Sequence, residues 1–200
     1  MTDTPGPITA CWLHWLALPT GDQQAVLDAM DLTDPQPVPF TDAVQIVDDD
    51  AHDGPAYERV YVTPELNGWT LVVGAWCDPV EADMPALCEQ LSTRFGQAQA
   101  YYYGAQNDGS AWLIAENGHI LRRAVHTGEP DDAALTIGAP LPYEEACRSE
   151  TGDDEDEWEY RQWELAPELA GVLSIDPHKL GPHTPCRGQG VMARTPHRPS

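Results

Sequence analysis

Two Asn-Gly pairs, at 67–68 and 117–118, constrain the fold of this chain more than any other feature of its sequence. Both positions of such a pair tolerate the positive φ angles that a tight hairpin turn requires. β-branched and aromatic residues flank each pair, which is the composition that strands favour. The sequence therefore predicts one β-hairpin within 59–76 and another formed by strands at 110–116 and 119–126.

The second hairpin has a predicted register. With the 117–118 pair as its loop, Trp112 faces Arg123, so that the guanidinium lies over the indole ring. Arg122 then points to the opposite face, beside Leu113. Because side chains alternate between the two faces of a sheet, these directions all fail together if the register slips by one residue.

The clearest helix is predicted at 84–95, between a capping residue, Asp83, and a stop at Gly96. Its apolar residues recur at helical spacing and form one stripe, which indicates that the helix packs against a sheet. The stripe comprises Met84, Leu87, Cys88, Leu91 and Phe95. Shorter elements are predicted at 8–18, 22–30, 41–47, 99–104, 142–148, 167–173 and 177–180.

These elements predict an α+β fold in a single domain over residues 1–182. Its core is a mainly antiparallel sheet of about five to seven strands, with helices packed mostly on one face. The segments 34–39 and 48–53 are predicted to be a turn-rich connector and an exposed acidic loop, and 149–159 a second acidic loop. Residues 183–200 are predicted to form a C-terminal extension, with a last strand at 189–194 and a disordered tail.

The chain carries 33 acidic and 10 basic residues, which give a formal net charge of −23. Such a charge repels nucleic-acid phosphates and anionic lipids and attracts basic protein surfaces. No apolar run approaches the length of a membrane span, and the first residues lack the pattern of a secretory signal. The five cysteines are widely spaced and odd in number, which favours reduced thiols. We therefore expect a cytoplasmic protein that binds neither nucleic acid nor membrane.

Three stretches carry a family resemblance: NGWTLVVG at 67–74, GSAWLIAENGHILRR at 109–123 with GEP after it, and LSIDPHKLGP at 173–182. Together they resemble a group of uncharacterised bacterial proteins, mostly actinobacterial, over residues 8–195. The shared motifs are turns, tryptophans and helix caps. The resemblance implies a single domain and brings no activity with it.

The acidic run at 153–157 adjoins two tryptophans, and this combination suits a protein interface. Aromatic side chains supply anchoring area, and carboxylates steer a basic partner toward them. We therefore expect a non-enzymatic recognition protein without a cofactor, such as an immunity or inhibitor protein against a basic toxin. The expected partner-binding residues are Asp153, Asp154, Glu155, Asp156, Glu157, Trp158 and Trp163. A purely solubilising acidic linker is the competing interpretation.

A small hydrolase or transferase is the alternative function. Histidine titrates near neutral pH and can exchange protons with a substrate, and tyrosines on one face of a strand can line a cleft. The candidate catalytic residues are Tyr101, Tyr103, His119 and His126. However, the pair formed by His119 and Glu116 beside an exposed turn is also an ordinary solvated arrangement, and the sequence motifs of common hydrolases are missing.

Two segments contain residue types that bind metals. His178, His183 and Cys186 suit zinc, but their spacing matches no known zinc-site pattern, so we expect a polar loop there. The acidic segment 48–53 suits a hard cation, but adjacent carboxylates on an extended chain point in different directions. The sequence therefore predicts no metal site.

Overall fold

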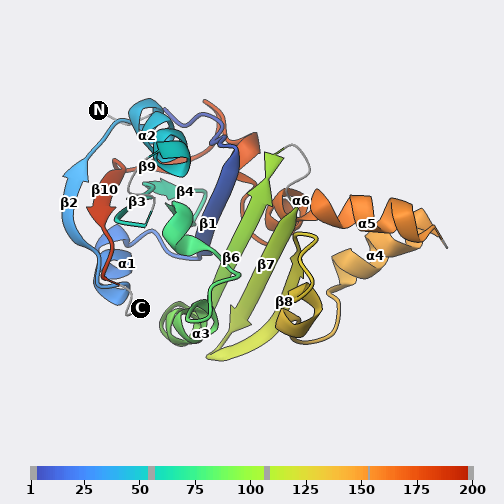
Figure 1. The fold of residues 1–200 in the computed structure, drawn as a ribbon. Helices are drawn as coiled ribbons and strands as arrows, with labels where there is room; N and C mark the ends of the chain where they lie inside the picture. The colour runs from blue at the N-terminus through green and yellow to red at the C-terminus, as the bar shows by residue number, and fades with distance from the viewer. Residues whose placement is uncertain (1–3, 54–56, 106–108, 153, 198–200) are drawn as a thin grey trace.

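The computed structural model describes residues 4–53, 57–105, 109–152 and 154–197, which form an α+β fold (Figure 1). The described strands of the main sheet are, in spatial order, β2 (Thr33–Pro37), β10 (Val191–Arg194), β3 (Arg59–Val62), β5 (Thr70–Val73), β1 (Trp12–Leu18), β6 (Gln97–Gly104), β7 (Ser110–Glu116) and β8 (His119–His126). All neighbouring pairs among them are antiparallel. The predicted α+β class is confirmed, with eight strands in the sheet rather than five to seven. A separate two-stranded sheet consists of β4 (Glu65–Leu66) and β9 (Cys186–Arg187).

Helices cover both faces of the main sheet, because successive side chains of its central strands are buried on opposite sides. In β1, for example, Trp15 belongs to one apolar cluster and Leu16 to the other. The Trp15 cluster receives side chains from α2 (Phe40–Asp53), α4 (Pro142–Thr151), α5 (Glu155–Trp163) and α6 (Leu165–Leu173). The Leu16 cluster receives them from α1 (Gln23–Ala29) and α3 (Met84–Phe95). None of the helices described combines the length and the apolar character that crossing a bilayer demands.

Both Asn-Gly pairs form the predicted turns. Asn67 and Gly68 have φ angles of 49° and 88°, and Asn117 and Gly118 have φ angles of 50° and 83°. Two consecutive positive φ values are the signature of the tight turn that joins twisted antiparallel strands. The sequence therefore located both chain reversals correctly.

The register predicted for the second hairpin is wrong, because a β-bulge follows the turn. Ala115 pairs with Ile120, whereas Ile114 pairs with Arg122, so Leu121 is an extra residue in β8. The side chain of Leu121 is exposed. Every pair beyond the bulge is therefore shifted by one residue.

The shift exchanges the predicted directions of the two arginines. Arg123 faces Leu113 rather than Trp112, and Arg122 takes the Trp112 side of the sheet. Arg123 is not a lid on the indole: its guanidinium donates hydrogen bonds to the carbonyl oxygens of residues 79–81 at 3.0, 2.6 and 3.4 Å.

Three segments that are predicted to be irregular form regular elements instead. The proline-rich connector contributes β2, an edge strand, which tolerates Pro35 and Pro37 because only one side of it is paired. Residues 48–53 continue α2 to its end. Within the predicted acidic loop, residues 149–151 form the end of α4 and residues 155–159 the start of α5.

The predicted C-terminal strand is present, and it is part of the main sheet. In β10, Val191 lies between Pro37 of β2 and Val62 of β3. Val191 and Ala193 are buried in the apolar cluster beneath α1 and α3. The folded unit therefore continues past the boundary predicted at residue 182.

Candidate functional site

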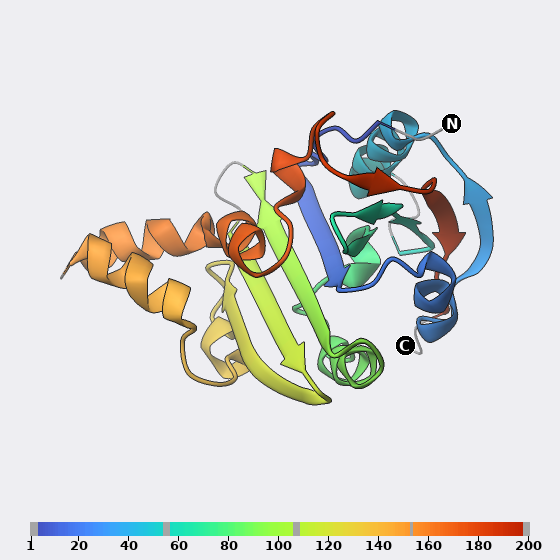
Figure 2. The ribbon, with the colours of Figure 1, turned by 180° about the vertical axis from the view of Figure 1, so that it is seen from behind.

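The helices α4 and α5 form a hairpin that projects beyond the β8 edge of the sheet (Figures 1 and 2). We call residues 142–163 the acidic arm. Nine of the 33 acidic residues of the chain lie in this arm, beside two basic residues. One of the nine, Asp153, lies outside the described residues.

The carboxylates at the tip of the arm, residues 154–157, are exposed and form the first turn of α5 with its cap. Asp154 is the N-cap, and its Oδ1 accepts a hydrogen bond from the backbone N–H of Glu157 at 3.0 Å. Acidic side chains in the first turn interact favourably with the positive end of the helix dipole. Arg148 of α4 forms an ion pair with Glu155 and links the two helices. A sequence of like charges thus forms an ordered helix start.

The aromatic residues of the arm divide between the inside and the outside. Trp158 is half-buried against the core, and the guanidinium of Arg148 lies 5.4 Å from its ring centre. Trp158 therefore fixes the arm to the body rather than standing free for a partner. Trp163 is half-buried too, but the neighbouring Tyr160 is 50% exposed, with the ring centres 6.3 Å apart. Tyr160 lies within the same acidic helix but is not among the residues predicted for the interface.

The root of the arm contains a buried ion pair. Arg122 of β8 donates hydrogen bonds to the carboxylate of Glu144 in α4, at 3.1 Å from Nε and 2.7 Å from Nη2. The two side chains are only 7% and 4% exposed. Arg122 Nη1 also donates to the Gly138 carbonyl at 3.0 Å, and Glu144 accepts from the Leu141 N–H at 2.9 Å. The additional hydrogen bonds offset the cost of taking both charges out of water.

A second polar cluster ties the arm to α6. Glu168 accepts a hydrogen bond from the Tyr143 hydroxyl at 3.0 Å and forms an ion pair with Arg161. Burial alone raises the pKa of Glu168, but the hydrogen bonds from Arg161 and Tyr143 lower it overall. Burial, together with Glu168, raises the pKa of Tyr143 to about 12. Tyr143 is therefore a neutral donor at neutral pH, and both helices of the arm are fixed at their base.

The two candidate catalytic tyrosines have different surroundings. Tyr101 is fully buried, stacks on Trp15 with ring centres 5.0 Å apart, and donates a hydrogen bond to Gln99 at 2.8 Å. Burial raises the pKa of its phenol, which makes it a core residue rather than an acid. Tyr103 is half-buried, and its ring lies edge-on to His178 at 5.4 Å.

The two candidate catalytic histidines lie at opposite ends of β8, so they cannot share one site. His119 is exposed beside the turn. His126 is partly buried, with its ring 5.1 Å from Trp112 and its Nε2 3.2 Å from Nε2 of Gln162. Burial, and then the charge of Arg122, lower the pKa of His126 to about 4. His126 is therefore neutral at physiological pH and contributes to packing beneath α5.

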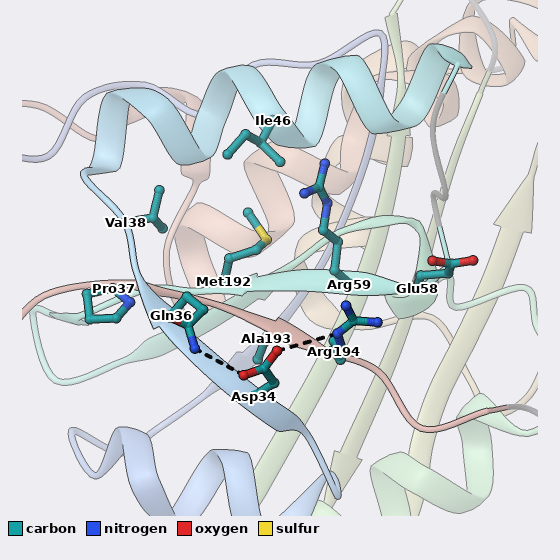
Figure 3. Close-up of a pocket in the computed structure, with 10 residues that line it drawn as sticks. All are labelled: Asp34, Gln36, Pro37, Val38, Ile46, Glu58, Arg59, Met192, Ala193 and Arg194. Atoms are coloured by element: carbon teal, nitrogen blue, oxygen red, sulfur yellow. Dashed lines mark hydrogen bonds and ion pairs between the residues drawn. The ribbon is translucent and has the colours of Figure 1, made fainter.

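A cavity of about 440 Å³ lies between α2 and the strands β2, β3 and β10 (Figure 3). Ile46 contributes an apolar part of its lining. Arg59 donates to both oxygens of Asp50, at 2.6 and 2.7 Å, and Arg194 lies 3.5 Å from Asp34. Because both guanidinium groups already have carboxylate partners, these residues give the cavity little charge selectivity.

The residues predicted as weak zinc candidates do not form a site. His178 Nδ1 lies 3.3 Å from Asp176, His183 is exposed, and Cys186 belongs to β9. Among the residues that the structure describes, one group of three metal-ligating side chains converges elsewhere. It comprises Cys11, Asp48 and His52.

Replacement of Glu144 by Gln tests the buried root of the arm. The change leaves the Arg122 charge buried without its counter-charge, so we expect the free energy of unfolding to fall by about 3 kcal/mol. Urea denaturation measures the loss. The adjacent, exposed Glu145→Gln is the matched control, and it should change the stability by less than about 0.5 kcal/mol. Equal effects of the two variants would contradict the role of the ion pair.

The pKa of His126 predicts a pH dependence of stability. Because the folded state holds this pKa at about 4, below the ordinary 6.5, the unfolded chain binds a proton first as the pH falls. The stability that neutral His126 contributes is therefore present above pH 6.5 and is lost as the pH falls from 6.5 to 4. Between about pH 7 and about pH 4.5, His126→Gln should lose about 2 kcal/mol less unfolding free energy than the wild type. If urea titrations show the same loss of unfolding free energy for His126→Gln and for the wild type, the lowered pKa of His126 is contradicted.

Comparison with known proteins gives no match: no family model fits the chain, and no curated protein or solved structure is significantly similar to it. The resemblance to actinobacterial proteins therefore stays a prediction.

Proposed function

We propose that the protein recognises a basic protein partner through the tip of its acidic arm. The observation that carries the proposal is the projection of α4 and α5 beyond the sheet, with the carboxylates of residues 154–157 exposed. A partner can approach such a tip from several directions without meeting the body of the domain. This role is that of a non-enzymatic recognition protein, and it suits an inhibitor or immunity protein against a basic toxin.

The electrostatics of the arm favour fast capture of a cationic surface. The whole chain has a net charge of −23, and the arm concentrates part of it on a narrow projection. A field of one sign increases the association rate of an oppositely charged protein, and salt weakens this effect. The ion pair between Arg148 and Glu155 supports the tip from within the arm.

The construction of the arm supports binding with little loss of entropy. The Arg122–Glu144 pair and the cluster around Glu168 fix both helices at their base, so the tip is presented by a preformed element. Tyr160 adds an exposed aromatic ring beside the carboxylates. Aromatic residues in such positions often contribute most of the binding energy of an interface. We assign Tyr160 this anchoring role in place of Trp158.

Neutralising the tip tests the proposal. The arm variant replaces residues 153–157 by Asn and Gln, which keeps an Asn cap at position 154 and reduces the acidic charge by five. A matched control removes five exposed carboxylates elsewhere through Asp28→Asn, Asp31→Asn, Asp42→Asn, Asp49→Asn and Glu89→Gln. Each immobilised protein is exposed to a lysate, and the captured proteins are quantified by mass spectrometry.

We expect basic proteins to be captured by the wild type and the control and lost from the arm variant by about tenfold at low salt. The difference should shrink as the ionic strength rises, because salt screens exposed charges. If the arm variant and the control capture the same proteins in the same amounts, the arm is not the interface.

Tyr160→Ala tests the anchor separately from the charge. With a captured partner, this variant should dissociate faster by about tenfold, whereas its association rate and salt dependence should stay close to those of the wild type. Tyr57→Ala is the control, since Tyr57 is 53% exposed and lies outside the arm. Surface plasmon resonance measures both rates. A slower association with an unchanged dissociation rate would contradict an anchoring role.

A further inference from the structure

A separate cluster of ligand-type side chains lies beside α2, which is far from the arm in both overall views (Figures 1 and 2). One donor atom each from Cys11, Asp48 and His52 lies within 4.8 Å of the other two. We propose that these three residues bind one zinc-class divalent cation, with water in the fourth coordination position. This site is independent of the proposed recognition by the arm.

The helix that contains two of the ligands brings them together. Because α2 continues to its end at Asp53, Asp48 and His52 are four residues apart in a helix and lie on the same face. Nδ1 of His52 lies 2.8 Å from the Asp48 carbonyl oxygen, so the ring is turned toward that residue. The divergence expected for carboxylates on an extended loop therefore does not apply to this pair.

The third ligand comes from the chain just before β1. The backbone N–H of Cys11 donates a hydrogen bond to Oδ1 of Asp48 at 3.3 Å, which holds this segment against α2. The ring of the next residue, Trp12, lies 5.2 Å from the His52 ring. Two elements that are distant in sequence are thus already in contact at the point where the three ligands meet.

The donor set indicates which metal would bind. Thiolate and imidazole are preferred ligands of zinc, and a carboxylate oxygen completes a three-residue set that leaves one position open to water. Calcium and magnesium prefer oxygen ligands alone, so the thiol selects against them. The strongly negative chain also raises the local concentration of cations.

The geometry requires only a small closure of the ligands. A tetrahedral ion with bonds of about 2.0–2.3 Å separates its ligands by about 3.5 Å. The side chains of Asp48 and His52 are 37% and 41% exposed, which leaves them room to adjust and keeps the site open to solvent. The Cys11 thiol loses its proton on binding, so zinc uptake should release a proton and become tighter as the pH rises.

Titration with cobalt tests the site directly, because Co²⁺ adopts the tetrahedral geometry of zinc and is coloured. Metal-free protein with its thiols reduced should bind one equivalent of Co²⁺. The spectrum should contain intense visible bands and a near-ultraviolet band from thiolate-to-cobalt charge transfer. Zinc should displace the cobalt, and an excess of magnesium or calcium should not.

Single-residue variants identify the ligands. Cys11→Ser should abolish the charge-transfer band, and His52→Gln should weaken cobalt and zinc binding at least about tenfold. Cys186→Ser is the matched control, because Cys186 is also a half-buried cysteine and its replacement should leave the spectrum unchanged. His52 is exposed, so His52→Gln keeps the test valid if Cys11→Ser fails to fold.

Three results would overturn the proposal. The first is a charge-transfer band that persists in Cys11→Ser or disappears in Cys186→Ser. The second is the weak spectrum of six-coordinate cobalt in the wild type. The third is binding that His52→Gln leaves unchanged, or that magnesium and calcium abolish.

Discussion

The buried ion pair between Arg122 and Glu144 holds the acidic arm against the β8 edge of the main sheet. A guanidinium enclosed beneath a helix is tolerable only with a full set of acceptors, and Glu144 and Gly138 supply them. The pair exists because the bulge at Leu121 turns Arg122 toward the Trp112 side of the sheet. Without that single extra residue, Arg122 would point to the opposite face of the sheet, and Glu144 would lose this partner.

Local signals made part of this fold predictable from the sequence. The Asn-Gly pairs fix two turns through backbone angles, and the apolar stripe identifies α3. The bulge was not predictable, because its setting is tertiary: Ile137 pairs with Arg123, and Gly138 lies so close to the Leu121 carbonyl that a Cβ would clash. The acidic run was found from its charge, but its helical state depends on a cap and on contacts with α4.

The two proposed sites differ in how much of them the sequence contains. The acidic residues at the tip of the arm are consecutive in the sequence, so they can be recognised there as one feature. The metal-ligating group joins Cys11 to a helix that begins nearly thirty residues later, and no spacing pattern indicates that contact. The candidate zinc residues near the C-terminus had suitable types but no convergence. Residue types in a sequence therefore indicate which metal could bind, but tertiary packing determines whether the ligand side chains come together.

The two edge strands of the main sheet, β2 and β8, are the places where another molecule could add a strand. At one edge, β2 has prolines at positions 35 and 37, which remove two amide donors from an otherwise open ladder. At the other edge, the backbone N–H and C=O groups of Arg123 in β8 are already hydrogen-bonded to the backbone of Ile137. A second molecule therefore meets two prolines at one edge, and at the other an Arg123 backbone that is already paired. Mutual repulsion of acidic chains adds to this obstacle, so strand-to-strand aggregation is opposed both by backbone chemistry and by charge.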